Sequence, residues 1–246
     1  MPAILIAILA FSSLGTAFVS GILGMAGGMI LMGILLAFLP VPAAMALHGI
    51  TQFASNAGRA WMWRREVDWQ VFRRYTAGAL AAFAVFAIAG IVVSKTAAFL
   101  ALGLMPFIAL ALPDRLQLGV ERRGHAETCG ALCSALSLTA GISGPVLDVF
   151  FARTPMTRQA VVATKAMSQC VSHLLKVLYF VALAAGAKAA VDPWAAAAMV
   201  ALALAGTHLS RRALEAMSEA SFRFWTRWTV IAAGVFYLGS AAMLML

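Results

Sequence analysis

The sequence predicts an all-α polytopic membrane protein made of two inverted repeats, each a re-entrant or broken helix hairpin followed by three transmembrane helices. Of the 246 residues, 63% are hydrophobic and only 11% are charged, whereas a soluble domain has about 25% charged residues. Apolar runs long enough to cross a bilayer recur along the chain, and glycine-rich stretches interrupt the apolar sequence at two places.

Six apolar segments can each span a membrane, which takes about 20 helical residues. They cover residues 42–63, 73–94, 96–112, 156–186, 193–210 and 224–245.

Two further pairs of apolar segments are predicted to form hairpins that enter the membrane and turn within it. Residues 3–20 and 29–39 flank GILGMAGGMI (21–30), and residues 126–140 and 145–152 flank TAGISGP (139–145). Glycine costs about 1 kcal/mol relative to alanine inside a helix, so one smooth helix through either stretch is unfavourable. The second arm of each pair has only about 8 to 11 residues, too few for a full crossing.

Arginine clusters orient the chain, because cytoplasmic loops of membrane proteins are rich in Arg and Lys. The clusters consist of Arg64, Arg65, Arg73 and Arg74; Arg115, Arg122 and Arg123; Arg153 and Arg158; and Arg211, Arg212, Arg223 and Arg227. With all four clusters in the cytoplasm, the first half begins outside and the second begins inside, as in an inverted repeat. We therefore divide the chain into a first repeat (1–115), a cytoplasmic linker (116–124) and a second repeat (125–246).

Similar side chains recur 117 residues apart in two of the long segments, LHGITQFASNAGR (47–59) and TKAMSQCVSHLLK (164–176). The pairs are His48 with Lys165, Thr51 with Ser168, Gln52 with Gln169, Ser55 with Ser172, Asn56 with His173 and Arg59 with Lys176. Five of these pairs fall on one helical stripe. Such residues can simply hold helices together, and Arg59 and Lys176 can extend to an interface, but the duplication favours a binding site.

A cationic stripe without carboxylate partners predicts an anion as ligand. The glycine turns fit this ligand, since short arms that are helical from Met29 and Val146 onward would begin with free N–H groups. Tight helix packing is the alternative explanation for each glycine. The predicted substrate-binding residues are Gly27, Gly28, His48, Gln52, Ser55, Asn56, Ser143, Gly144, Lys165, Gln169, Ser172 and His173. We expect Lys165, with His48, to supply the charge.

GILGMAGGMI and ALHGITQFASNAGR, followed by AGISGP and VVATKAMSQCVSHLLK, resemble the TauE/SafE family of sulfite exporters. The resemblance implies a multi-pass carrier in the bacterial inner membrane for sulfite or organosulfonates, coupled to the proton gradient. The sequence departs from the family pattern at Pro145 and Asp148. An anion channel, or a transporter of sulfate or thiosulfate, remains an alternative.

Asp148 is the one carboxylate well inside a predicted apolar segment. It is expected either to carry the coupling proton or, slightly favoured, to neutralise Lys165 or Arg153. The sequence contains no HExxH or GxSxG motif, so we expect no enzymatic activity. Cys129 and Cys133 lack further metal ligands at suitable spacing, so no metal or cofactor is expected. The expected partners are a small anion and the lipid bilayer, without nucleic acid; a homodimer stays open.

Overall fold

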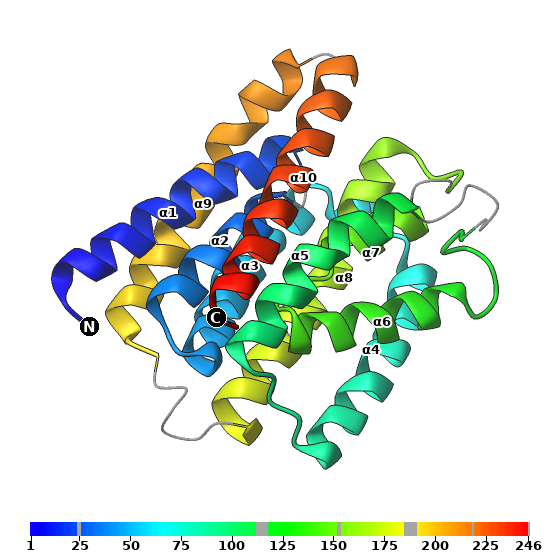
Figure 1. Ribbon diagram of the computed structural model, residues 1–246. Helices are drawn as coiled ribbons and strands as arrows, with labels where there is room; N and C mark the ends of the chain where they lie inside the picture. Colours follow the sequence, from blue (N-terminus) through cyan, green and yellow to red (C-terminus); the bar gives the residue numbers. More distant parts are fainter. Residues whose placement is uncertain (24–25, 112–117, 152–153, 185–190, 218, 246) are drawn as a thin grey trace.

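The computed structural model describes residues 1–23, 26–111, 118–151, 154–184, 191–217 and 219–245, and these residues are almost entirely helical (Figure 1). The α-helices are α1 (Ala3–Leu23), α2 (Ala26–Phe38), α3 (Val41–Met62), α4 (Trp69–Ala89), α5 (Lys95–Ala111), α6 (His125–Thr139), α7 (Gly144–Phe151), α8 (Arg158–Leu178), α9 (Pro193–Ala216) and α10 (Glu219–Met243). A 3-10 turn, η1 (Arg64–Glu66), follows α3, and a π-helix, η2 (Tyr179–Ala184), continues α8. The helical class predicted from the sequence is confirmed for these residues.

Both glycine-rich stretches interrupt the helices, as predicted. α6 ends at Thr139 and α7 begins at Gly144, close to the expected bounds. α2 begins at Ala26 rather than at Met29, so Gly27 and Gly28 lie in its first turn instead of before it. α1 also has 21 residues and is long enough to cross a membrane, which is longer than the predicted hairpin arm. Gly24, Arg115 and Arg153 lie outside the described residues.

α4 is displaced toward the N-terminus relative to the predicted segment 73–94, because of two local signals at its ends. The Asp68 side chain accepts hydrogen bonds from the backbone N–H groups of Gln70 (3.0 Å) and Val71 (2.9 Å), which caps the helix before Trp69. Gly90 ends the helix in the left-handed conformation (φ 60°). The hydropathy pattern alone carries neither signal.

The largest helix contacts join one half of the chain to the other. α1 packs along α9, α4 along α6, α3 across α8 and α5 along α10 (Figure 1). α2 is buried beside α1, α3 and α10, with Met29, Met32 and Leu35 fully inaccessible. The first helix of each hairpin thus makes its largest contact with a helix from the opposite half of the sequence.

Glycine allows close backbone approach at two of these contacts. A Cβ at Gly78 of α4 would overlap the carbonyl of Glu127 on α6, and a Cβ at Gly206 of α9 would overlap the carbonyl of Leu14 on α1. Small residues that let helix backbones approach closely are typical of packing in membranes.

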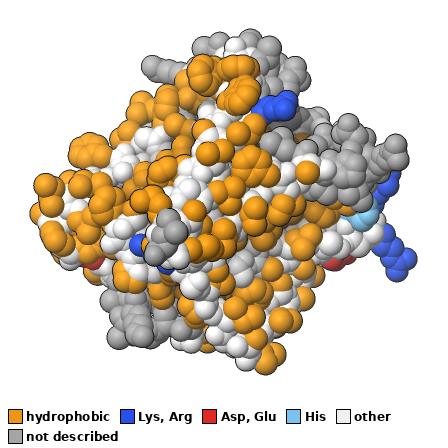
Figure 2. Space-filling view, in the orientation of Figure 1, with side chains coloured by type: hydrophobic (Ala, Val, Ile, Leu, Met, Phe, Trp, Pro, Cys, Tyr) orange, Lys and Arg blue, Asp and Glu red, His pale blue; other side chains and the backbone are white. Residues whose placement is uncertain are grey.

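The surface has the character of a membrane protein. Four described helices are long and apolar enough to cross a bilayer: Ala3–Ile22, Trp69–Ala89, Gln159–Leu183 and Pro193–Arg211. Figure 2 shows a face on which apolar side chains predominate, with few charged groups among them. The surface also exposes large apolar side chains that a soluble protein would bury, among them Ile88 (88%) and Ile4 (74%).

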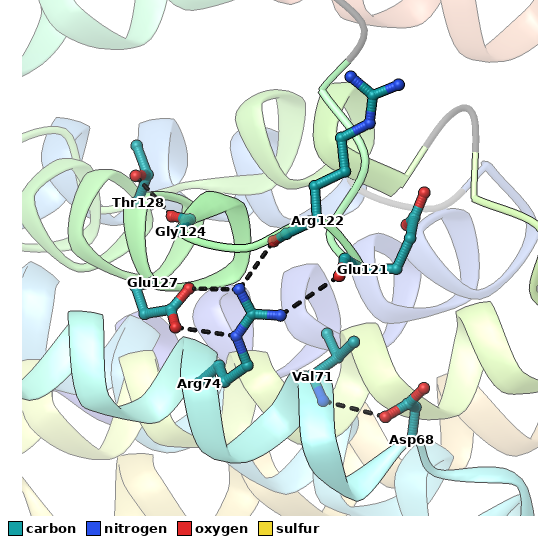
Figure 3. Close-up of polar contacts among 8 residues, drawn as sticks. All are labelled: Asp68, Val71, Arg74, Glu121, Arg122, Gly124, Glu127 and Thr128. Carbon is teal, nitrogen blue, oxygen red and sulfur yellow. Dashed lines mark hydrogen bonds and ion pairs between the residues drawn. The ribbon is translucent and has the colours of Figure 1, made fainter.

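Two of the Arg-rich clusters contact each other through Arg74 and Arg122. Arg74 forms a bidentate ion pair with Glu127 (2.8 and 2.9 Å) and donates to the carbonyl oxygens of Glu121 and Arg122 (Figure 3). The start of α4 is therefore joined to the segment that leads into α6. Away from this contact, the N-terminal ammonium forms an ion pair with Asp192, just before α9, at 2.8 Å.

Candidate anion site

A small pocket lies where the two helix breaks meet the polar stripes of α3 and α8. It encloses about 330 Å³ of empty space, part of which is open to solvent. The lining residues are Ser20, Gly28, His48, Gln52, Asn56, Ile142, Ser143, Gly144, Pro145, Gln169 and His173. Eight of the twelve predicted substrate-binding residues are therefore brought together here.

The lining draws equivalent positions from both halves of the chain. Gln52 and Gln169 lie near the middle of α3 and α8, and Asn56 and His173 lie one turn further along. Gly28, in the first turn of α2, and Gly144, the first residue of α7, place two helix N-termini at the pocket. N–H groups in a first helical turn have no partner within the helix and favour negative charge.

Three buried polar atoms of the pocket have no hydrogen-bond partner among the described residues: Asn56 Oδ1, Ser143 Oγ and His173 Nδ1. Because a buried polar group without a partner costs about 1–3 kcal/mol, such groups in one cavity indicate a ligand or ordered water. The Ser143 hydroxyl and a protonated His173 Nδ1 can donate. Asn56 Nδ2 already donates to Gln52 O (2.9 Å), so Asn56 offers an acceptor, which suits water or a protonated oxygen.

The basic side chain beside the pocket is that of Lys176, which is 0% exposed. Its Nζ atom lies 2.7 Å from His48 Nδ1 and 2.8 Å from the carbonyl oxygen of Gly141, in the α6–α7 turn. His48 Nε2 lies 2.9 Å from the carbonyl oxygen of Gly28. Lys176 therefore does not extend to an interface, which was the alternative to a binding role, because its neighbours enclose it and supply polar partners.

The family model described as sulfite exporter TauE/SafE matches residues 9–237, which is nearly the whole chain and both halves of the pocket. The chain belongs to the TauE/SafE family. Membership confirms the resemblance seen in the sequence and indicates a membrane transporter of sulfur-containing anions. No curated protein and no solved structure matches the chain.

Four predicted site residues of this TauE/SafE protein do not line the pocket. Ser55 Oγ lies 2.7 Å from Thr207 Oγ1 of α9, and Ser172 Oγ lies 2.7 Å from the Tyr75 hydroxyl of α4. A Cβ at Gly27 would collide with the backbone of α1 at Thr16 and Ser20. These three residues therefore lie at contacts between helices, in line with the alternative weighed for them, and their role in binding stays a prediction.

Lys165 is the fourth such residue. Its ammonium forms an ion pair with Asp148 of α7, and the Asp148 side chain remains 44% exposed. The pair matches the expectation that Asp148 neutralises Lys165, while a coupling role of Asp148 stays a prediction. The geometry thus assigns the buried charge next to the TauE/SafE pocket to Lys176 rather than to Lys165, eleven residues earlier on the same helix.

Sequence reasoning missed Ser20, Ile142, Pro145 and, above all, Lys176. Ser20 and Ile142 carry no signal of their own, and Pro145 stood out only as a departure from the family pattern. Lys176 belongs to the duplicated stripe, but the predicted site takes its charge from Lys165 instead. The three cysteines are buried thiols, and Cys129 and Cys133 lie 3.9 Å apart (Sγ–Sγ). Within the described part of the chain no group of three His, Cys, Asp or Glu side chains could hold a metal ion.

Proposed function

We propose that this chain is a secondary transporter that moves small sulfur-containing oxyanions, such as sulfite or an organosulfonate, across the bacterial inner membrane together with protons. The observation that carries the proposal is the pocket between the two helix breaks. It combines two helix N-termini, polar atoms without a partner among the described residues and the buried side chain of Lys176. An enzymatic function finds no support in this lining.

The chemistry of the pocket suits an oxyanion. An anion that leaves water must find replacement donors and positive charge in the protein, because its desolvation is unfavourable. Gln52 and Gln169 carry amide donors, Ser143 carries a hydroxyl, and the Gly28 and Gly144 positions allow close approach to the backbone. Lys176 supplies charge from behind His48.

The helix contacts support an internal two-fold repeat, which the proposed inverted architecture requires. If α1–α5 correspond to α6–α10 in order, then the contact of α1 with α9 corresponds to that of α6 with α4. The contacts of α3 with α8 and of α5 with α10 each correspond to themselves. The hydrogen bonds of Ser55 and Ser172, 117 residues apart, likewise join corresponding helices, α9 and α4.

Transport against a gradient would separate a coupled carrier from an anion channel. Proteoliposomes containing the purified protein are given an inward proton gradient and radiolabelled sulfite, with sulfate, thiosulfate and a short sulfonate compared. We expect at least one of these anions to accumulate above its external concentration, and an uncoupler to abolish the accumulation. Flux that only equalises the two concentrations would indicate a channel. No flux of any anion, with folded protein in the membrane, would contradict the proposal.

Two glycine variants connect this assay to the pocket. Gly28→Val and Gly144→Val place side chains where the anion is proposed to lie, so each is expected to abolish flux while the protein still purifies as a folded species. Gly15→Ala is the control, since a Cβ there has no atom within 4 Å.

A further inference from the structure

Lys176, His48 and two carbonyl groups form a continuous buried hydrogen-bond chain between the two helix breaks. A carbonyl oxygen can only accept, so His48 Nε2 carries a proton and donates it to Gly28 O at 2.9 Å. His48 Nδ1 then faces Lys176 Nζ at 2.7 Å, and Nζ donates to Gly141 O at 2.8 Å. One proton is shared along the Nδ1–Nζ contact, and either nitrogen can hold it.

No described carboxylate neutralises this pair. The carboxylates with ion-pair partners bind elsewhere: Asp148 with Lys165, Glu127 with Arg74 and Asp192 with the N-terminus. Both members of the pair are fully inaccessible to solvent. A buried charge without a counter-ion is strongly unfavourable.

The other titratable groups around Lys176 add no negative charge. His173 of the same helix places its ring 5.7 Å from that of His48. α4 and α6, which also pack on α8, contribute Tyr75, Cys129 and Cys133, and the Tyr75 hydroxyl bonds to Ser172. From η2, the Tyr179 hydroxyl donates to the carbonyls of Phe86 and Ile91. At the far end of α8, η1 contributes the exposed Glu66 and the arginines beside it.

We propose that the Lys176–His48 pair holds the proton that accompanies the anion into the pocket. The inference rests on the proposed function, because it requires an anion beside His48. An anion there provides the missing counter-charge, so it stabilises the protonated pair, and by thermodynamic reciprocity the protonated pair binds the anion more tightly. The step is a simple protonation: a proton from the aqueous phase binds Nζ or Nδ1 and is released when the anion leaves.

The sign of the pH effect follows from this linkage. Since anion binding takes up a proton, anion affinity increases as the pH falls. Lys176 does not line the pocket and acts through His48, so we regard it as a positioning residue.

Proton uptake can be counted by isothermal titration calorimetry on the full-length protein in detergent. Sulfate, thiosulfate and sulfite are titrated at one pH in two buffers of different ionisation enthalpy, with sulfite at a pH where it is fully ionised, so that any proton taken up binds the protein. For wild type we expect about one proton taken up per anion bound. Anion binding without proton uptake would overturn the inference while leaving the proposed function intact.

Variants assign the proton to residues. Lys176→Met is expected to lose at least tenfold in anion affinity together with the proton uptake, while Lys176→Arg should bind the anion without proton uptake because a guanidinium stays charged. Lys95→Met, the same substitution at the first residue of α5, is the matched control and should behave as wild type. If Lys176→Met does not fold, the difference in proton uptake between wild type and Lys176→Arg still tests the assignment.

Asp148→Asn separates the two candidate proton carriers. It should keep the proton uptake; loss of uptake in Asp148→Asn, with uptake retained in Lys176→Arg, would overturn the assignment. A folded wild-type protein that binds none of the three anions would overturn the proposed function and this inference with it.

Discussion

At Gly28 a single added carbon atom would disturb the pocket. A Cβ there would collide with the amide nitrogen of Gln52 and lie 3.9 Å from His48 Nε2. Both neighbours line the pocket, so a methyl group displaces the groups that we propose contact the anion.

We therefore expect Gly28→Ala to weaken anion binding at least tenfold, about 1.4 kcal/mol, with little change in folded yield. Calorimetric titration with the anion that binds wild type best measures the effect. Gly15→Ala should leave affinity unchanged. Equal affinities of Gly28→Ala and wild type would show that the anion does not use this side of the pocket.

Ser55 and Ser172 allow helix packing to be separated from binding. Each bonds a hydroxyl on another helix instead of lining the pocket. We expect Ser55→Ala and Ser172→Ala each to lower stability by about 0.6 kcal/mol, the average for such bonds in a membrane protein, without changing anion affinity. Thermal unfolding followed by fluorescence, together with titration, tests both. A large loss of affinity at normal stability would restore them to the binding site.

Only those site residues that belong to a repeated sequence pattern could be predicted. The duplication in α3 and α8 and the two glycine breaks identified most pocket residues, because binding groups from both halves recur at one spacing. Lys165 and Lys176 look alike in sequence, since both are cations on one helix. Which of them is buried depends on where α3 crosses α8, at Gly49, whose added Cβ would lie 3.2 Å from Lys176 Cε. That crossing point is a tertiary property.

Among the elements, α4 and α6 show how one glycine determines a helix contact. The carbonyl of Glu127 occupies the space that a side chain at Gly78 would need, and a backbone carbonyl inside a helix cannot move aside. Gly78→Leu should therefore separate the two helices and abolish the folded protein, seen as loss of the monodisperse peak in size-exclusion chromatography. Gly239→Leu on α10, where nothing lies within 4 Å, is the control. A normal peak for Gly78→Leu would mean that the contact does not limit folding.

The positions of the helices were predictable from hydropathy, whereas several helix ends were not: α9 continues to Ala216, beyond the predicted 210, and α10 begins at Glu219 rather than at 224. α3 and α5 lie within a residue of their predicted bounds because apolar character and helix coincide there. α4 begins and ends earlier because Asp68 and Gly90 act through hydrogen bonds and backbone conformation. α2 extends back through two glycines because a side chain at Gly27 would collide with α1 and one at Gly28 with Gln52 of α3, which outweighs the propensity cost of glycine.

At the scale of the whole molecule, the proposed topology makes a clear prediction for labelling. With both termini outside and the Arg-rich connections inside, Ile91→Cys and Met245→Cys should react with a membrane-impermeant maleimide in spheroplasts, and Arg65→Cys should react only after lysis. The native cysteines are buried and should contribute little background. Termini on opposite faces would require a parallel repeat.

The packing of each hairpin's first helix along a helix of the opposite half has a consequence for biosynthesis. The first hairpin leaves the ribosome long before α9, the helix along which α1 packs. Until α9 is synthesised, the first hairpin lies in the bilayer without the helix that makes its largest contact. Each half should therefore need the other for stability. Either half synthesised alone should be degraded by membrane proteases, whereas the two halves co-expressed as separate polypeptides should assemble and both accumulate.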